Sequence, residues 1–301
     1  MTTTSGAHPK ALWPGVKAFF GKTYDEKPLV CTMVFDEQSS DKSYEERVEE
    51  TGFGLAPKKA EGAAISYDTD AQGYTSRLTN VVYALGAKIT KEAISDNQYE
   101  AVAKKKSAKL ARSMRHTKEN VHANVLNRGF DSAFVGGDGK ELFATDHPTM
   151  SGTQSNELAV AADMSEASIE DMLTLIRGAK DSRGLRIQLK GMKLIVPAAL
   201  EFDATRILSS VNQSGTDLND INAMRHMGML PGGVVVWDYL TDDDAFFIKT
   251  DADEGLIHQK RWALALEQDN DFDTKNACMS AEERYAAGWA DWRGVYASPG
   301  A

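Results

Sequence analysis

Residues 90–126 decide the fold, and they read TKEAISDNQYEAVAKKKSAKLARSMRHTKENVHANVL. Apolar side chains recur there at steps near three and four, which places them in one stripe along an α-helix. The stripe comprises Tyr99, Val102, Ala103, Leu110, Met114, Val121, Val125 and Leu126. At ~1.5 Å per residue, about 30 residues would form a rod of roughly 45 Å. We predict one long helix, capped by Thr90 at its start and followed by Gly129 in the left-handed conformation.

The segment before this helix is a polar ribbon, about residues 47–67. Residues 52–59 have the glycine and proline content of a hairpin tip, and residues 63–67 resemble a return strand. The ribbon has few side chains that could form a core, and an isolated two-stranded hairpin is marginally stable in water. It therefore needs a surface that another molecule supplies, which points to assembly before catalysis.

Composition narrows the class of protein. The chain has 301 residues, of which 42% are apolar, and a formal net charge of −10. Nucleic-acid readers usually show the opposite charge balance. No apolar run approaches the ~20 residues of a membrane span. Residues 1–7 lack the pattern of a secretory signal, so we expect an extended N-terminal arm. Cys31 and Cys278 stand apart from any metal-binding pattern and are interpreted as buried thiols instead of a disulfide.

The basic residues gather on the predicted helix. They are Lys104, Lys105, Lys106, Lys109, Arg112 and Arg115. A solvated helix face is one interpretation. Contact with phosphates, or pairing with acidic neighbours, is the other.

The rest of the chain mixes helices and strands without βαβ alternation, which indicates the α+β class. Helices are predicted at 165–179, where Ser165 is the N-cap, and at 198–209. Strands are predicted at 74–84, 192–196, 234–237 and 245–248. The C-terminal end is β-rich at 256–266 and 285–297. Residues 211–232 are polar and rich in glycine and asparagine, as in a surface loop.

A search for chemistry finds no active site. Residues 269–273 read DNDFD and imitate a calcium loop, but Thr274 stands where the turn needs glycine and Ser280 where a bidentate glutamate belongs. None of the known nucleophile, phosphate-binding or zinc motifs is present. His147, between Asp146 and Pro148, is interpreted as a loop histidine bonded to backbone. We therefore predict no catalytic residue, no cofactor and no metal.

The order of segments nevertheless resembles a known family. Four stretches carry the likeness in the N-terminal half: Glu49–Gly54, Glu61–Asp68, Ala84–Glu92, and the long helix followed by Asn127–Phe130. Gly191–Leu200, Glu282–Gly288 and Trp292–Gly294 extend it to the second half. Over about residues 12–298 the chain resembles the major capsid proteins of tailed bacteriophages with the HK97-like fold, particularly the Mu-like major head subunit group.

The resemblance implies a role for each segment. Residues 1–43 would be the N-terminal arm, 44–80 the extended loop over a neighbouring subunit, and 81–149 the peripheral domain with its spine helix. Residues 150–255 would form the axial domain, and 256–301 would return to the peripheral domain. The residues implied at each site are Phe53, Leu55, Lys58 and Lys59 for contacts between subunits, Tyr99, Val102, Leu110 and Met114 for packing of the spine helix, and Asn212, Asp217 and Asn219 for the loop at the capsomer centre.

The same resemblance implies partners and location. Identical subunits would form pentamers and hexamers of an icosahedral head, assembled in the host cytoplasm and retained in the virion. Because the chain has no room for a scaffolding segment, the resemblance implies either a separate scaffolding protein or a sequence that is a processed form, and we expect the separate protein. It also implies a portal, a possible decoration or cement protein, and packaged double-stranded DNA held without sequence-specific binding. No membrane is expected. A covalent crosslink through Lys58 or Lys59 is not expected.

Two other functions fit the sequence less well. An encapsulin-like nanocompartment would use the same shell fold around enzymes. A hydrolase would use loop residues such as Asp146 and His147.

Overall fold

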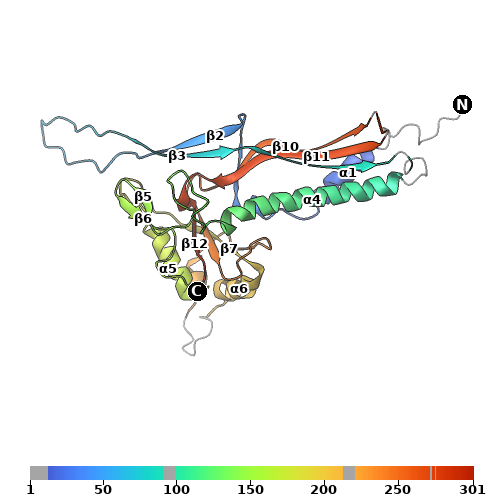
Figure 1. Ribbon diagram of the computed structural model, residues 1–301. Coiled ribbons are helices and arrows are strands. Elements are labelled where there is room, and N and C mark those ends of the chain that lie inside the picture. The colour runs from blue at the N-terminus through green and yellow to red at the C-terminus, as the bar shows by residue number, and fades with distance from the viewer. Residues whose placement is uncertain (1–12, 91, 93–98, 213–220, 272, 275) are drawn as a thin grey trace.

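The computed structural model describes residues 13–90, 92, 99–212, 221–271, 273–274 and 276–301, and for residues 13–16 and 99–101 it describes the backbone only. Figure 1 shows an elongated upper part, a second part below it, and a long hairpin that projects from the upper part. The mixture of helices and strands agrees with the predicted α+β class. Every helix among the described residues is too short or too polar to cross a membrane.

The upper part is built on a four-stranded sheet. Across the sheet its strands are β1 (Asp36–Ser39), β10 (Leu256–Asn270), β11 (Ala277–Trp289) and β4 (Val81–Ile89). β1 is parallel to β10, and the other neighbours are antiparallel. Helix α4 (Tyr99–Asn127) packs on one face, with α1 (Trp13–Tyr24) beside it (Figure 1). Leu110, Met114, Ile89 and Met279 are buried between helix and sheet.

The long helix is confirmed from Tyr99 to Asn127, where its predicted end lies. Its predicted beginning, with most of residues 91–98, lies outside the described residues. The prediction for Gly129 was wrong, because its φ is not positive. A Cβ at Gly129 would overlap the ring of Phe143. Glycine is required there by the close approach of an aromatic ring to the backbone.

The hairpin is longer than predicted. β2 (Tyr44–Glu50) pairs antiparallel with β3 (Gln72–Thr79), so the return strand lies after residues 63–67, and 51–71 form no regular element. The two strands pair where the body of the protein supports them: Ser76 is buried and donates to the carbonyl of Ala290 over 3.1 Å. Beyond residues 50 and 72 the body no longer supports the hairpin. An unsupported pair of strands is only marginally stable in water, so the pairing of β2 with β3 ends there.

The strand predicted at 74–84 is two strands, β3 and β4, which meet at Asn80. The Asn80 side chain is buried and donates to Ser40 Oγ and to the carbonyl of Lys42, both over 3.0 Å. This amide fixes the turn between the hairpin and the four-stranded sheet. The N-terminal segment is thereby held as well, because Ser40 directly follows β1.

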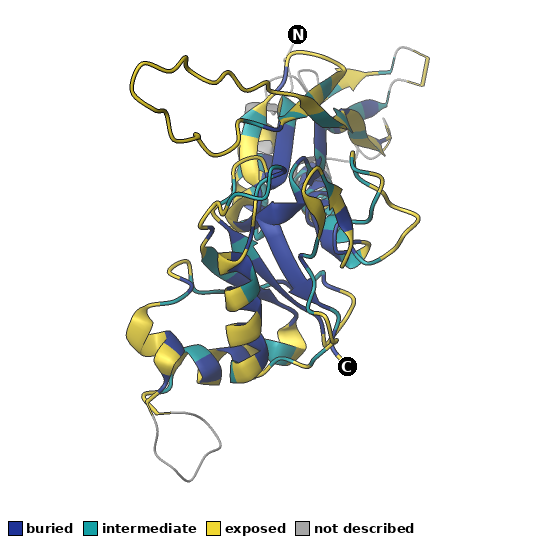
Figure 2. Ribbon diagram, turned by 90° about the vertical axis from the view of Figure 1, so that its left-hand side faces the viewer, coloured by how far each residue is buried: buried dark blue, intermediate teal, exposed yellow. Residues whose placement is uncertain are grey.

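The lower part contains a second four-stranded sheet. Across the sheet its strands are β12 (Val295–Ser298), β9 (Phe246–Thr250), β7 (Gly191–Val196) and β8 (Val234–Val236). The helices of this part are α5 (Glu166–Arg177), α6 (Glu201–Ser209) after the short η3 (Ala198–Leu200), and α7 (Ala223–Met227). Ser165 caps α5 as predicted, accepting from the Ser168 N–H over 3.1 Å. Figure 2 shows buried strands in the centre of this part and exposed helices at its end.

One core joins the two parts. It includes α2 (Cys31–Val34), the end of α4 at Ala123 and Leu126, and Trp237 and Trp292. The last strand needs a correction to the expected segment 256–301: β12 pairs with β9 in the lower sheet, after the turn η4 (Trp292–Gly294), while β10 and β11 lie in the upper sheet. The short ribbon β5 (His147–Thr149) and β6 (Gly152–Gln154) lies at the junction (Figure 1).

Candidate assembly surfaces

The hairpin loop, residues 51–71, is exposed along most of its length. Figure 2 shows its exposed residues projecting away from the body. Phe53 is 62% exposed and Leu55 82%, and Lys58 and Lys59 are exposed beside them. Two apolar residues that the sequence interpretation did not single out lie on the return side, Ile65 and Tyr67, the latter 93% exposed. Their apolar character in a polar segment was the available signal.

The base of this hairpin is tied to the junction between the two parts. Glu49 accepts from Ser182 and lies 3.5 Å from the Arg293 guanidinium. Arg183 donates to the carbonyl of Thr69, and its guanidinium lies 3.6 Å from Asp68. These contacts fix the direction in which the hairpin leaves the body. The apolar side chains at its tip, Phe53 and Leu55, stay exposed in the isolated subunit.

The carboxylate of Asp68 bridges the two sides of the loop. Asp68 accepts from the backbone N–H of Gly54 over 2.8 Å, across the ribbon, and from the N–H of Thr69 over 2.9 Å. These two bonds, with Arg183 nearby, lower the pKa of Asp68. They hold the two sides of the loop together where no β ladder does.

Glu119 connects three segments that are far apart in the sequence. From α4 its carboxylate accepts from the N–H groups of Val30 (2.6 Å) and Cys31 (3.2 Å) at the start of α2. It also accepts from the indole N–H of Trp237 in the lower part over 2.9 Å. Glu119 is buried, and a buried charge is tolerated only when such partners surround it. The N-terminal segment, the long helix and the lower part are thus held together by one side chain.

A buried histidine pair lies next to this point. His122 donates from Nδ1 to the Lys118 carbonyl over 2.7 Å, so its Nε2 accepts from the Nδ1–H of His258, 2.9 Å away. Burial, with a smaller contribution from the nearby Lys118 ammonium, lowers the pKa of His122 to about 4 and that of His258 to about 3. Both rings are therefore neutral near pH 7. The pair was missed in the sequence because its members are 136 residues apart.

Lys118 itself is neutralised by Glu283. Its ammonium lies 2.6 Å from the Glu283 carboxylate, and both side chains are largely buried between α4 and β11. Such a pair is tolerated inside a protein because each charge is compensated by the other.

His147 has a structural environment. The prediction that it bonds backbone was wrong: Nδ1 donates to Asp138 over 2.6 Å and Nε2 lies 3.1 Å from the Asn156 Oδ1. Its ring is fully buried and stacks on Trp292, with centroids 4.3 Å apart. Asn156 donates in turn to the carbonyls of Leu142, Trp292 and Val295. With both nitrogens engaged and no exposure, the ring cannot reach a substrate.

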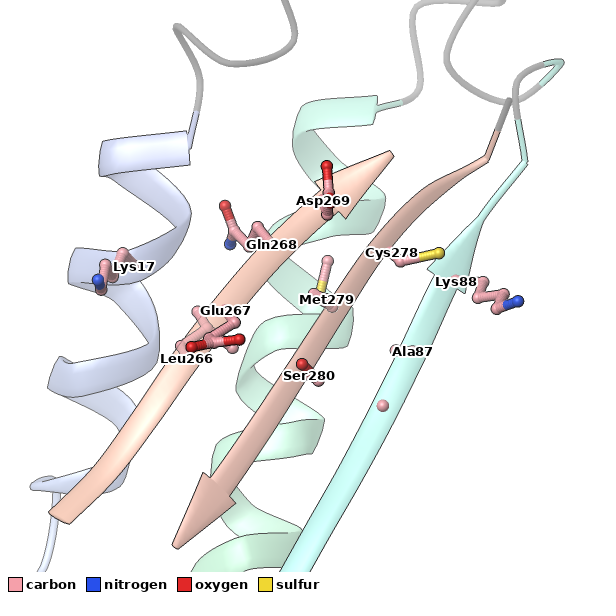
Figure 3. A pocket seen from close by; sticks show the side chains of 11 residues that line it. Lys17, Ala87, Lys88, Leu266, Glu267, Gln268, Asp269, Cys278, Met279 and Ser280 are labelled. Atoms are coloured by element: carbon pink, nitrogen blue, oxygen red, sulfur yellow. The ribbon is translucent and has the colours of Figure 1, made fainter. Parts of the chain in front are cut away.

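An open groove of about 990 Å³ lies at the outer end of the upper sheet (Figure 3). Glu267 and Asp269 from β10, Ser280 from β11 and Lys88 from β4 line it, with Lys17 at its side. Its charges are of both signs and are spread along separate strands. No group of three or more His, Cys, Asp or Glu residues in the described part of the chain is placed to bind a metal ion.

The acidic turn after β10 holds itself together through its own side chains. Asp271 accepts from the Thr274 hydroxyl over 2.8 Å and lies 3.6 Å from the Lys88 ammonium. Thr274 and Lys88 thereby occupy the carboxylate at position three of the imitated calcium loop.

The two cysteines are free thiols. Cys31 is buried as expected, and burial raises the pKa of its thiol to about 12. Cys278 is only half-buried, on β11. Cys31 is therefore protonated near pH 7 and behaves as a small apolar side chain.

The remaining predicted residues fall into two groups. On the long helix, Leu110 and Met114 are buried and Val102 is half-buried against the same core, while the Tyr99 side chain lies outside the described residues. In the lower part Asn212 forms a bridge with Ile221, and Asp217 and Asn219 lie outside the described residues. Exposed apolar side chains near this bridge were missed by the sequence interpretation: Phe202, Val211, Ile221 and Met227, each 68–70% exposed.

Residues 73–298, about three quarters of the chain, match the sequence model of a family described as phage capsid protein. No curated protein sequence matches the chain.

Several solved structures share the fold at low sequence identity. The capsid of an empty GTA particle is 10% identical, with a TM-score of 0.57, over 89% of this chain and 88% of that chain. The Mycobacterium phage Patience structure is 12% identical, with a TM-score of 0.55, over 99% and 90%. A virus-like particle from Pyrococcus furiosus is 8% identical, with a TM-score of 0.54, over 95% and 98%. The projecting hairpin, the long helix on a four-stranded sheet and the second sheet are thus the HK97-like fold of capsid subunits.

Proposed function

Because this chain belongs to the phage capsid protein family, we propose that it is a major capsid protein whose copies close an icosahedral phage head from pentamers and hexamers around double-stranded DNA. Shell closure requires one patch of a subunit to meet a different patch on the next subunit. A projecting hairpin supplies such a patch. The Mu-like subgroup stays a prediction.

The observation that carries this proposal is the hairpin loop. Its base is anchored by Glu49 and Arg183, while Leu55 and Tyr67 at its tip are almost entirely exposed. Ordering such a loop costs roughly 1–2 kcal/mol of backbone entropy per residue, so contacts outside the subunit must stabilise it. Obligate interfaces that commonly bury ~2,000–5,000 Å² can supply this free energy.

Deletion of residues 52–59 tests the proposal. The expected product is a folded protein that stays in solution and forms no shells in negative-stain electron micrographs. Circular dichroism and thermal melting should match the parent, because the deleted residues make few contacts with the body. As a control, Lys17→Gln with Lys190→Gln changes two exposed lysines outside the loop and should leave shell formation intact. Normal shells from the deletion variant would refute the proposed role of the loop.

Segment roles follow from the same proposal. Residues 1–43 act as the N-terminal arm, 81–149 with β10 and β11 as the peripheral domain, and 150–255 with β12 as the axial domain. The Asn212–Ile221 end, with its exposed Phe202 and Met227, then faces the centre of each capsomer. Ile221→Asp should block capsomers while leaving the monomer folded, because a charge would be buried at the ring centre.

The proposal includes partners and excludes chemistry. A separate scaffolding protein, a portal and a decoration or cement protein complete the head, which assembles in the host cytoplasm, and the subunit itself performs no reaction. The buried position of His147 favours this over a hydrolase built on the Asp146–His147 loop.

The likeness to the virus-like particle from Pyrococcus furiosus favours a second candidate, an encapsulin-like compartment. Mass spectrometry of purified shells separates the two: packaged enzymes carrying one shared peptide would support the compartment, whereas a portal and packaged DNA support the phage head.

A further inference from the structure

The outward face of helix α4 has a strong concentration of positive charge in an acidic chain. Residues 102–118 contain seven Lys or Arg and no Asp or Glu, although the whole chain has a net charge of −10. Within residues 102–118, therefore, no acidic side chain offsets the positive charge of the helix.

Part of this charge is used inside the subunit. Arg115 donates to the carbonyls of Tyr24 and Pro28, at 3.2 and 2.6 Å, and ties α1 to α4. Lys118 is paired with Glu283, and Lys106 donates to the carbonyl of Lys88. These three residues have clear structural roles.

Of the other four cations, Lys104 is half-buried and three are exposed. Lys105 and Lys109 are exposed and have no ion-pair partner among the described residues. Arg112 lies 3.8 Å from Glu26, but both side chains are more than 60% exposed, so this pair contributes little. At steps of four and three residues these cations lie on one helix face, opposite the buried Leu110 and Met114.

The shape and spacing of this face fit a polyphosphate. A shallow groove of about 500 Å³ runs along it, lined by Lys109 and Arg112 and continuing past His116 to Asn120. Seven residues of helix from Lys105 to Arg112 span roughly 10 Å. Phosphates on one DNA strand advance ~3.4 Å each along the helix axis, so about three of them match this length.

We propose that Lys105, Lys109 and Arg112 on the open face of α4 contact the phosphates of double-stranded DNA, without reading its sequence. This rests on the proposed function, and it assigns the DNA-facing side of the subunit to the face of α4 opposite the sheet. Three contacts per subunit bind weakly and are sensitive to salt. DNA can therefore slide along a shell that is otherwise acidic and repels it.

Salt-dependent binding to a labelled duplex of about 30 base pairs, followed by fluorescence anisotropy, tests the proposal with the full-length chain. Three released counterions give a slope of about −2.7 in log affinity against log salt, which is about 40-fold weaker binding at 200 mM than at 50 mM. The triple variant K105Q/K109Q/R112Q should lose most of this slope. The variant K105R/K109R keeps the positive charge at both lysines and should keep the salt slope of the parent.

The matched control is K58Q/K59Q/K190Q, which removes the same net charge from exposed lysines elsewhere. Its slope should equal that of the parent. Equal losses in the two triple variants, or no duplex binding by the parent, would overturn the proposal. Equally tight binding of polyglutamate at the same salt concentration would also overturn it, because the face would then fit an acidic protein. Glutamine is a good helix former, so α4 is expected to stay folded, which circular dichroism checks.

Electron microscopy of the same variants distinguishes this inference from the proposed function. Shells from the K105Q/K109Q/R112Q variant together with an unchanged salt slope refute only the DNA contact. A parent protein that never forms shells refutes the proposed function itself.

Discussion

The Nε2 atom of His122 on α4 lies 2.9 Å from the Nδ1 atom of His258 on β10, and both rings are buried beside the Lys118 ammonium. This contact attaches the long helix to the upper sheet at the junction with the lower part. Because its two rings are neutral in the folded protein, it makes stability depend on pH.

Acid is expected to destabilise the subunit between about pH 6.5 and pH 4. The pKa of each ring is lowered on folding, so the unfolded chain takes up protons first as the pH falls. The stabilisation is fully present above pH 6.5 and is lost towards the folded pKa values. Between pH 7.5 and 5.0 the loss should be on the order of 2 kcal/mol per histidine. Urea denaturation at the two pH values measures it.

Two variants serve as controls for this pH effect. His258→Asn should reduce the pH dependence by about half, because His122 remains. Asn120→Gln, on the exposed side of the same helix, changes no titratable group and should leave the pH dependence unchanged. Equal pH dependence in the parent and His258→Asn would show that other groups control acid stability.

Glu119→Gln is expected to destabilise the subunit by roughly 2–4 kcal/mol. In the parent, Oε1 of Glu119 accepts from the Val30 N–H, and Oε2 accepts from the Cys31 N–H and the Trp237 indole N–H. The N–H₂ group of glutamine would replace one of these oxygens and point at its donors, which would lose their acceptor. Trp237→Phe removes one donor and keeps most of the ring, so its cost should be smaller, about 1–2 kcal/mol. Chemical denaturation ranks the two, and the opposite order would contradict the central role of the carboxylate.

Gly129→Ala should cost about 1–3 kcal/mol, because the new methyl group would overlap the Phe143 ring in a close-packed core. Gly21→Ala is the matched control. Gly21 lies within α1 with open space around it, so alanine there should be neutral or stabilising by about 0.5–1 kcal/mol. Thermal melting of the two variants gives the comparison.

Limited proteolysis should cut the hairpin loop in unassembled subunits and leave it intact in shells. Residues 51–71 form no regular element and carry Lys58 and Lys59, which trypsin recognises. Exposed loop tips are the preferred sites of nicking. Equal cutting rates before and after assembly would mean that no neighbour covers the loop.

Local patterns predicted the long helix α4, α5 and α6, but they missed α1 and α7, which lie in segments expected to be an arm and a loop. The spacing of Leu110 and Met114 gave the long helix, and Ser165 gave the start of α5, because periodicity and capping act within a few residues. Strand pairing was harder to predict. The return strand was wrongly placed at 63–67. The sequence does not reveal that Ser76 bonds to Ala290, and this contact supports the part of the hairpin that forms strands.

The exposed apolar residues of the proposed assembly surfaces were foreseen only in part from the sequence. Phe53 and Leu55 are conspicuous as apolar residues in a glycine-rich tip, whereas Phe202 lies on a helix and could equally have been buried. The contacts that join the two parts, from Glu119 to Trp237 and from His122 to His258, link residues more than 100 positions apart. Such pairs follow from tertiary packing and leave no local pattern.

The position of the last strands in the sequence determines when during synthesis the subunit can fold. β10 and β11 are the two inner strands of the upper sheet, and β12 completes the lower one, yet all three lie within residues 256–298. A nascent chain that has emerged only to residue 255 contains the residues of the projecting hairpin, but it lacks Ala290, which supports them, and the strands on which α4 rests. Residues 256–298 must therefore emerge before either sheet can be completed.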